Sequence, residues 1–277
     1  MSTHGITWFP DFVNENAFKT LRDDWNTNVV RLAMYVDEWG NGSCYMSNKQ
    51  GSREMVEKGI DLCIKLDMYC IVDWHVLNPG DPSKYTNEAK EFFDYISRKY
   101  GNYPNIIYEI CNEPNSGADW DNNIKPYAEQ IIPVIRANDP DAIVIVGTPT
   151  WSQDIDRALA NPLKHDNVMY ALHFYAATHT DWLRDRVKTC VNSGLPVFVS
   201  EFGMCDASGG GANDFNQATQ WLNLFDSLNI SYCNWALANK NETCCAIGSW
   251  AGANGNWNES ELTESGKWIR NWFKNHK

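Results

Sequence analysis

The stretch Ile106-Ile-Tyr-Glu-Ile-Cys-Asn-Glu-Pro-Asn115 decides the fold. Its apolar run leads into an acid, Glu113, and then into a proline that turns the chain. A second stretch, Pro196-Val-Phe-Val-Ser-Glu-Phe-Gly203, repeats this arrangement around Glu201. Each pattern predicts a buried strand followed by an ionisable group, and α/β barrels assemble their active sites at the carboxyl ends of their strands. Two such acids suit a reaction that needs both a proton donor and a nucleophile or base.

Similar apolar runs recur along the chain and alternate with amphipathic segments. The predicted strands cover Asn28–Val36, Met68–Val76, Asn105–Asn112, Ala142–Gly147, Val168–Tyr175, Pro196–Glu201 and Ser231–Leu237. The predicted helices cover Asn14–Trp25, Ser52–Leu66, Asn87–Tyr100, Asp119–Ala137, Gln153–Leu159, Thr180–Ser193, Asn213–Leu228 and Glu264–Asn275. Strands that alternate with helices imply parallel pairing through right-handed crossovers. We expect Ser52 to cap the second helix.

This alternation predicts an α/β fold, a (β/α)₈ TIM barrel whose first strand is truncated or missing at the N-terminus. The sequence opens with Met1-Ser-Thr-His-Gly5, which contains no apolar run. An open seam in a barrel would expose unpaired backbone groups, and the N-terminal residues are expected to fill part of it. No Pro/Gly/Ser-rich linker or repeat divides the sequence, so we expect a single domain over residues 1–277.

The composition excludes several classes of partner. A formal net charge of −12 argues against binding to nucleic acids or anionic membranes. The sequence has no apolar run of about 18 residues, which a transmembrane helix needs, and it does not begin with a signal peptide pattern.

Thirteen Trp and twelve Tyr suit a sugar ligand, whose ring faces are apolar and whose edges carry hydroxyls. Tryptophans in loop-like segments are Trp8, Trp39, Trp151, Trp250 and Trp257.

The nine cysteines and six histidines show no metal-binding spacing, and neither H-E-x-x-H nor C-x-x-C occurs. Cys44, Cys205, Cys244 and Cys245 lie in loop-like sequence and could form disulfides, although the connectivity does not follow from sequence. We expect no metal and no organic cofactor.

The motifs Ile110-Cys-Asn-Glu-Pro-Asn115 and Val199-Ser-Glu-Phe-Gly203 belong to a longer ordered series. The other members are Ser2-Thr-His-Gly5, Val30-Arg-Leu-Ala-Met-Tyr35, Val72-Asp-Trp-His75, Tyr100-Gly-Asn-Tyr-Pro-Asn105, Tyr127-Ala-Glu-Gln-Ile-Ile-Pro-Val-Ile-Arg-Ala-Asn138, Ala171-Leu-His-Phe-Tyr175 and Asn234-Trp-Ala-Leu237. Together they resemble glycoside hydrolase family 5, specifically the endoglucanases (cellulases) of its subfamily 2. The resemblance implies a (β/α)₈ barrel that hydrolyses internal bonds of β-1,4-glucan with retention of the anomeric configuration.

The resemblance also implies a role for each matching residue. Glu113 looks like the general acid/base and Glu201 like the nucleophile. Asn112 is expected to bind the sugar 2-hydroxyl, and Tyr175 to donate a hydrogen bond to the nucleophile. Arg31 is expected to lie beneath the nucleophile, where a cation favours the ionised carboxylate.

Other expected contacts lie along the cleft. His75 and His173 are expected near the catalytic centre, and Trp235 is expected to stack on the sugar bound just before the cleavage point. By the same resemblance, the residues expected to contact more distant sugars are His4, Trp8, Tyr35 and Lys240.

Several alternatives remain open. A nucleotide-binding enzyme is disfavoured because no G-x-G-x-x-G or G-x-x-x-x-G-K-[ST] motif follows a strand. A barrel that binds carbohydrate but has lost catalysis remains possible, as does a related β-1,4-hemicellulase such as a mannanase, xyloglucanase or lichenase. Among the other acids, Glu109 is expected in a buried ion pair and Asp73 as a hydrogen-bond acceptor. We expect a monomer that acts on β-glucan polysaccharide and is secreted, because a polymer cannot enter a cell.

Overall fold

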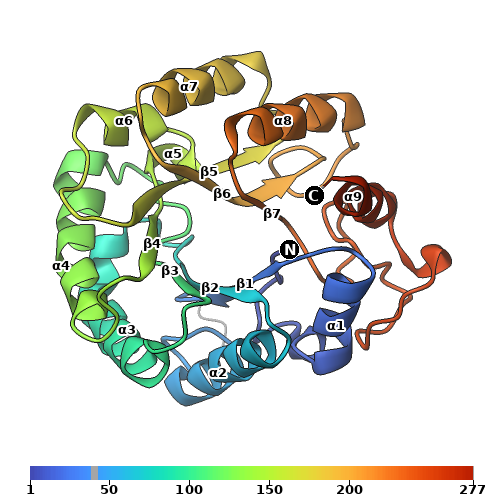
Figure 1. The fold of residues 1–277 in the computed structure, drawn as a ribbon, viewed down its shortest axis with the longest axis horizontal. Coiled ribbons are helices and arrows are strands. Elements are labelled where there is room, and N and C mark those ends of the chain that lie inside the picture. Colours follow the sequence, from blue (N-terminus) through green and yellow to red (C-terminus); the bar gives the residue numbers. More distant parts are fainter. Residues whose placement is uncertain (39–42, 277) are drawn as a thin grey trace.

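The computed structural model describes residues 1–38 and 43–276, which form a parallel barrel surrounded by helices (Figure 1). Within these residues seven strands form one sheet in the order β1 to β7, and each strand pairs in parallel with the next. The strands are β1 (Val29–Tyr35), β2 (Tyr69–His75), β3 (Ile106–Glu109), β4 (Ile143–Val146), β5 (Val168–Tyr175), β6 (Val197–Gly203) and β7 (Tyr232–Asn234). The predicted α/β barrel is confirmed.

The N-terminal residues close the seam between β1 and β7. Ser2 forms a parallel bridge with Arg31, and Thr3 forms one with Leu237. The Thr3 N–H donates to the Arg31 carbonyl at 2.8 Å, and the Leu237 N–H donates to the Ser2 carbonyl at 2.8 Å. The truncated first strand is therefore a short bridge that pairs on both sides, and the seam is filled as expected. The predicted strand Ser231–Leu237 is shorter in the structure, where β7 ends at Asn234 and Leu237 pairs with Thr3 of this bridge.

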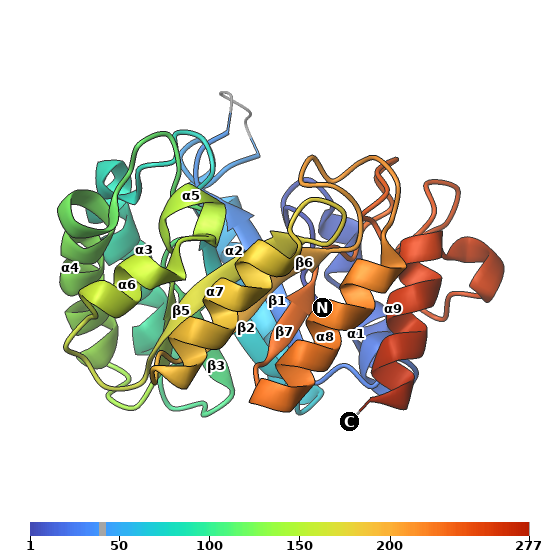
Figure 2. The same ribbon diagram turned by 90° about the horizontal axis from the view of Figure 1, so that it is seen from above.

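Helices form the outer layer, and Figure 2 shows the loops that follow the strands gathered at one end of the barrel. The helices are α1 (Glu15–Asp23), α2 (Lys49–Lys65), α3 (Thr86–Tyr100), α4 (Lys125–Arg136), α5 (Pro149–Ser152), α6 (Ile155–Ala160), α7 (Asp181–Asn192), α8 (Phe215–Leu228) and α9 (Glu264–Asn275). Shorter helical turns cover Pro10–Phe12, Pro82–Tyr85, Trp120–Ile124 and Glu259–Glu261. None of the helices in the described part of the chain is both long and apolar enough to cross a membrane.

The predicted cap of the second helix was wrong. Helix α2 begins at Lys49, and Asn48 caps it by accepting a hydrogen bond from the Gly51 N–H at 3.0 Å. Ser52 lies inside the helix and is buried. An asparagine at the N-cap satisfies a backbone donor of the first turn, so the helix starts where this acceptor is placed.

The tryptophans in loop-like sequence differ in their exposure to solvent. Trp250 is 70% exposed, whereas Trp257 is buried and packs near Phe12 and Trp25, so Trp257 cannot present its ring to a sugar. Trp39 lies outside the described residues.

The barrel interior changes from apolar to charged along the strands. A buried apolar cluster fills the part nearer the amino ends and consists of Ile71, Ile107, Ile145, Ala171, Phe198 and Cys233. Two residues further along their strands, Asp73 and Glu109 are both fully buried. Burying ionised groups costs free energy unless they are paired, so this layer needs a cation, which Arg31 of β1 supplies.

Candidate active site

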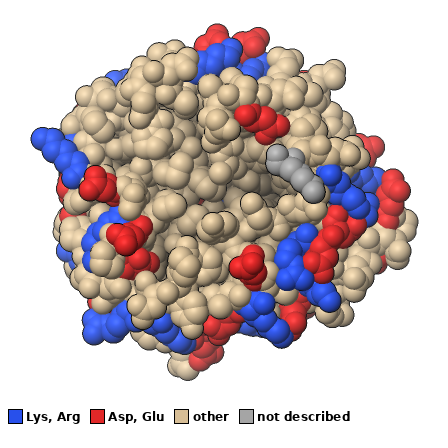
Figure 3. Space-filling view, in the orientation of Figure 1, with Lys and Arg blue, Asp and Glu red and all other residues tan. Residues whose placement is uncertain are grey.

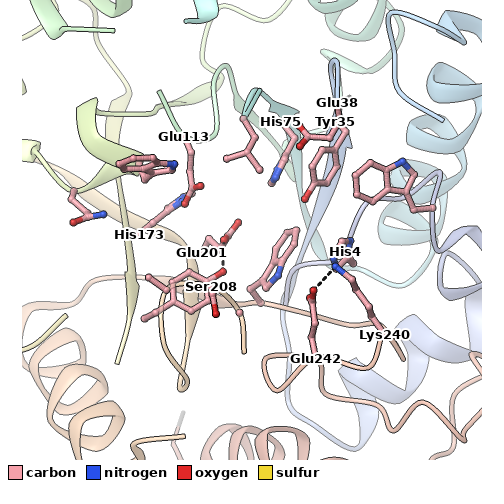
Figure 4. Close-up of a pocket in the computed structure, with 18 of the residues that line it drawn as sticks. His4, Tyr35, Glu38, His75, Glu113, His173, Glu201, Ser208, Lys240 and Glu242 are labelled. Atoms are coloured by element: carbon pink, nitrogen blue, oxygen red, sulfur yellow. Dashed lines mark hydrogen bonds and ion pairs between the residues drawn. The ribbon is translucent and has the colours of Figure 1, made fainter. Parts of the chain in front are cut away.

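A cleft of about 640 Å³ opens at the carboxyl ends of the strands (Figure 4). All the predicted site residues except Arg31 and Asn112 line it. The residues from the prediction that line the cleft are Glu113, Glu201, His4, Trp8, Tyr35, His75, His173, Tyr175, Trp235 and Lys240.

The two predicted catalytic acids face each other across this cleft (Figure 4). Glu113 lies in the loop after β3, where its N–H donates to the Val76 carbonyl at 3.1 Å, and Glu201 lies in β6. One carboxylate oxygen of each acid and a ring nitrogen of His173 all lie within 4.8 Å of one another. Carboxyl groups about 5–5.5 Å apart are typical of glycosidases that retain configuration, whereas inverting enzymes need about 6.5–9.5 Å.

Glu201 is held by two hydrogen bonds. The Tyr175 hydroxyl donates to Oε1 at 2.8 Å, and Arg31 Nη1 donates to Oε2 at 3.0 Å. The same guanidinium pairs with Glu109 at 2.6 Å and with Asp73 at 2.9 Å. Arg31 therefore lies beneath Glu201, and Glu109 is in the buried ion pair that the sequence predicted. Burial would raise the pKa of Glu109, but Arg31 and His173 hold it at about 2.

Glu113 has a different environment. Burial and the negative charge of Glu201 raise the pKa of Glu113, while His173 opposes the rise. His173 Nδ1 lies 2.9 Å from Glu113 Oε1. Its Nε2 lies 2.9 Å from the Ser200 hydroxyl, which donates to Glu109 at 2.5 Å. Burial alone would lower the pKa of His173, but Glu109 and Glu113 raise it to about 9.

A metal ion could in principle be ligated by Glu113, His173 and Glu201. Their existing contacts disfavour metal binding. Both oxygens of Glu201 already accept hydrogen bonds, and the fixed positive charge of Arg31 would repel a metal ion.

An irregularity in β6 brings Ser200 into this network beside Glu201. Ala171 pairs with Phe198 and His173 pairs with Glu201, so β6 has one residue more than β5 over this span. The register with β7 shifts between Val199 and Phe202 in the same way. Such a bulge redirects side chains that would otherwise alternate between the two faces. The sequence analysis missed Ser200 because strict alternation places it on the opposite face from Glu201.

His75 lines the cleft, and Asn112 is buried behind it. His75 Nδ1 lies 2.6 Å from Asp73, and its Nε2 lies 3.2 Å from the Asn112 amide nitrogen. Burial and Arg31 lower the pKa of His75 to about 3, so the neutral ring donates to Asp73 and accepts from Asn112. The amide oxygen of Asn112 accepts from Arg31 at 2.6 Å. Asn112 is fully buried, and its contact with a sugar stays a prediction.

One end of the cleft is aromatic. The rings of Trp8 and Tyr35 stack with centroids 4.3 Å apart, and His4 lies 4.9 Å from Trp235, which directly follows β7. Burial lowers the pKa of His4 to about 3, with Lys240 adding to the effect, so this ring is also neutral.

The cleft is also lined by Trp151, which is 46% exposed and was not predicted as a site residue. Thr150, Trp151 and Ser152 all have left-handed backbone angles, with φ values of 58°, 54° and 57°. Such conformations cost about 1–3 kcal/mol each and cluster at functional sites. The turn is held by the Ser152 hydroxyl, which donates to the Asn112 carbonyl at 2.7 Å, so Trp151 is fixed to the loop that carries Glu113. The other lining residues that the sequence analysis missed include Glu38, Gln153, His179, Ser208 and Glu242.

Comparison with known proteins places this geometry in a family. Residues 1–241 match the family model for cellulase (glycosyl hydrolase family 5). The chain belongs to glycosyl hydrolase family 5. This family 5 chain is 47% identical over 270 residues to an endoglucanase of Clostridium saccharobutylicum, and the match covers 98% of this chain and 59% of the relative. The chain thus spans less than two thirds of that relative's length.

Solved structures of family 5 agree with the fold. The catalytic domain of Thermobifida fusca endoglucanase Cel5A superimposes with a TM-score of 0.94 at 38% identity, covering 99% of this chain and 90% of that chain. A variant of the same domain in complex with cellotetraose superimposes with a TM-score of 0.93 at 37% identity, covering 99% and 90% of the two chains. The assignment to subfamily 2 stays a prediction.

Proposed function

We propose that residues 1–277 form a single catalytic domain, a retaining endo-β-1,4-glucanase that acts on cellulose or related β-glucans. The observation that carries this proposal is the short separation of the Glu113 and Glu201 carboxylates. The similarity to an endoglucanase and to a domain solved with cellotetraose supports the glucan substrate.

In the first step, a Glu201 oxygen bonds to the anomeric carbon while the bond from that carbon to the glycosidic oxygen breaks. Glu113 donates its proton to the departing oxygen. The hydrogen bonds from Tyr175 and Arg31 position Glu201 for this attack.

In the second step, the ester with Glu201 is hydrolysed. Esterification removes the charge of Glu201, which is one cause of the raised pKa of Glu113. Glu113 is then the better base, takes a proton from water, and the resulting hydroxide bonds to the anomeric carbon as the bond to Glu201 breaks. Two displacements restore the original configuration.

The remaining cleft residues bind the sugars. Trp235 stacks on the sugar just before the cleavage point, with His75 beside it, and Asn112 binds the 2-hydroxyl. Trp151 offers a further, partly exposed ring in the cleft. Contacts to more distant sugars come from His4, Trp8, Tyr35 and Lys240. We also propose that the protein is secreted, because its polymeric substrate is found outside cells, and that it acts as a monomer.

Reducing-sugar release from soluble carboxymethyl cellulose tests the proposal. Glu201→Ala should lose essentially all activity on every substrate. Glu113→Gln should lose about 10²–10⁴-fold on natural glucan, yet still release an activated leaving group, which needs no proton. Glu54→Gln, an exposed control, should match the wild type.

Two outcomes would contradict the proposal. If the folded wild type binds cellotetraose, as measured by Trp fluorescence, but releases no sugar, the protein is a binding protein. Mannan cleaved as fast as linear β-glucan, or faster, would indicate a hemicellulase.

A further inference from the structure

Three thiols and a carboxylate meet where the loops after β6 and β7 pack together. Cys205, Cys244 and Cys245 are fully buried. The Cys244 thiol lies within hydrogen-bonding contact of both other thiols, and its Sγ is 3.9 Å from Glu242 Oε2. The Glu242 side chain is 29% exposed and so has access to water, yet one of its oxygens points toward the Cys244 sulfur.

This cluster has the composition of a site for a soft divalent cation. One oxygen of Glu242 and the sulfurs of Cys244 and Cys245 lie within 4.8 Å of one another. Around zinc, thiolates about 2.3 Å from the metal are about 3.8 Å apart, so small side-chain rotations would bring these ligands to that spacing. Thiolate ligands select soft or borderline cations over magnesium and calcium.

The backbone already holds the two loops in place. The Cys244 N–H donates to the Gly209 carbonyl at 3.0 Å, and the Thr243 hydroxyl donates to the Gly211 carbonyl at 2.8 Å. Isolated buried cysteines act as small hydrophobes, but that role does not account for a carboxylate placed against them. Among the residues that the structure describes, this is the one group of three mutually close metal-binding side chains that includes cysteine.

We propose that Glu242, Cys244 and Cys245, with Cys205 as a fourth ligand, bind one zinc- or cadmium-type cation at the rim of the cleft. The cation competes with Lys240, whose Nζ lies 2.5 Å from Glu242 Oε1 (Figure 4). Removing the positive charge of Lys240 therefore strengthens cation binding, a response that a purely structural thiol cluster does not show.

Titration of the full chain with Cd²⁺, in a phosphine reductant that keeps thiols reduced, tests the proposal. Cadmium–thiolate bonds absorb in the ultraviolet, so the band reports thiolate ligation directly. The wild type should bind one equivalent. Cys244→Ser should weaken binding by roughly 100-fold or more, whereas Cys190→Ser, which removes a buried thiol of α7, should bind like the wild type.

Two further variants keep the proposal falsifiable if Cys244→Ser does not fold. Glu242→Gln should weaken binding by about tenfold or more, and Lys240→Ala should tighten it several-fold. The proposal is overturned if folded wild type shows no thiolate band, or if Glu242→Gln and Lys240→Ala leave the affinity unchanged. It is also overturned if cadmium binds without the band, which would place the ion away from the thiols.

Discussion

At the scale of single residues, Arg31 joins the reaction centre to the barrel core. It contacts Glu201, which faces the cleft, and also Glu109 and Asp73, which do not. Because it is fully buried, water cannot screen or replace these contacts. The residue that orients the proposed nucleophile therefore also stabilises the fold.

Replacing this guanidinium should be costly. Arg31→Met leaves buried carboxylates unpaired, and breaking a buried ion pair in this way costs about 3–5 kcal/mol. Urea unfolding should show that loss of free energy, whereas Arg98→Met, at an exposed pair with Asp94, should cost less than about 1 kcal/mol. Equal small losses for both variants would contradict the assigned role of Arg31.

His173 should affect the alkaline limit of activity through the pKa of Glu113. Glu113 must be protonated to act as an acid, and the cationic ring of His173, whose pKa is raised to about 9, opposes the rise in the pKa of Glu113. In His173→Asn that opposition is gone, so the pKa of Glu113 rises further. The alkaline limb of the kcat/KM profile should therefore move to higher pH, and a limb that stays in place or moves to lower pH would contradict this.

The control for this profile is His165→Asn. His165 also pairs with a glutamate, Glu129 at 2.9 Å, but it lies outside the cleft. Its substitution should leave both limbs of the profile unchanged.

At the scale of elements, the strands were predictable and their irregularities were not. Runs such as Val168–Tyr175 read as strands because both faces are buried, and the predicted bounds match β5. The bulge in β6 depends on pairing with β5 and β7, which no local pattern encodes. The left-handed turn at Thr150–Ser152 likewise depends on distant partners such as Asn112.

The candidate site, like the strands, was predictable where it depends on sequence motifs. Motifs that match the family located the residues of the cleft, including Glu113 and Glu201. Ser200 was missed because its place in the network comes from the bulge in β6. Trp151 was noted only as a loop tryptophan, because its position in the cleft depends on the left-handed turn.

The start of α2 offers a direct comparison of two candidate caps. Asn48→Ala should destabilise the protein by about 1 kcal/mol, because a first-turn N–H loses its acceptor. Ser52→Ala should change stability by less than about 0.5 kcal/mol, because the Ser52 hydroxyl has no hydrogen-bond partner among the described residues. Thermal unfolding of both variants measures the difference, and the reverse order of stability would contradict the observed cap.

At the scale of the whole molecule, the N-terminal bridge should contribute to the stability of the entire barrel. Thr3→Pro removes the N–H that bonds to Arg31, whereas Thr3→Val keeps it, and both remove the hydroxyl that accepts from Ala33. An unsatisfied buried group costs about 1–3 kcal/mol, so the proline variant should unfold more easily by about that amount. Equal unfolding free energies would show that the seam tolerates opening.

On one face of the molecule, the charged residues lie mostly away from the barrel axis. Figure 3 shows the face at the amino ends of the strands, where charged residues lie mostly around the edge and the middle is hollowed. That hollow is lined in part by Val29, Tyr69, Ile107 and Phe198. On this face the charged side chains therefore lie where water can solvate them, whereas the buried carboxylates inside the barrel pair with Arg31.

The order of the strands divides the proposed chemistry between two halves of the chain. Glu113 follows β3 and Glu201 belongs to β6, with the segment 164–167, mostly exposed, between them. A chain cut in that segment would leave one acid on each fragment, and Arg31 would remain with the fragment that lacks its catalytic partner. Neither fragment could complete both displacements, so hydrolysis would act as a reporter for reassembly of the two pieces.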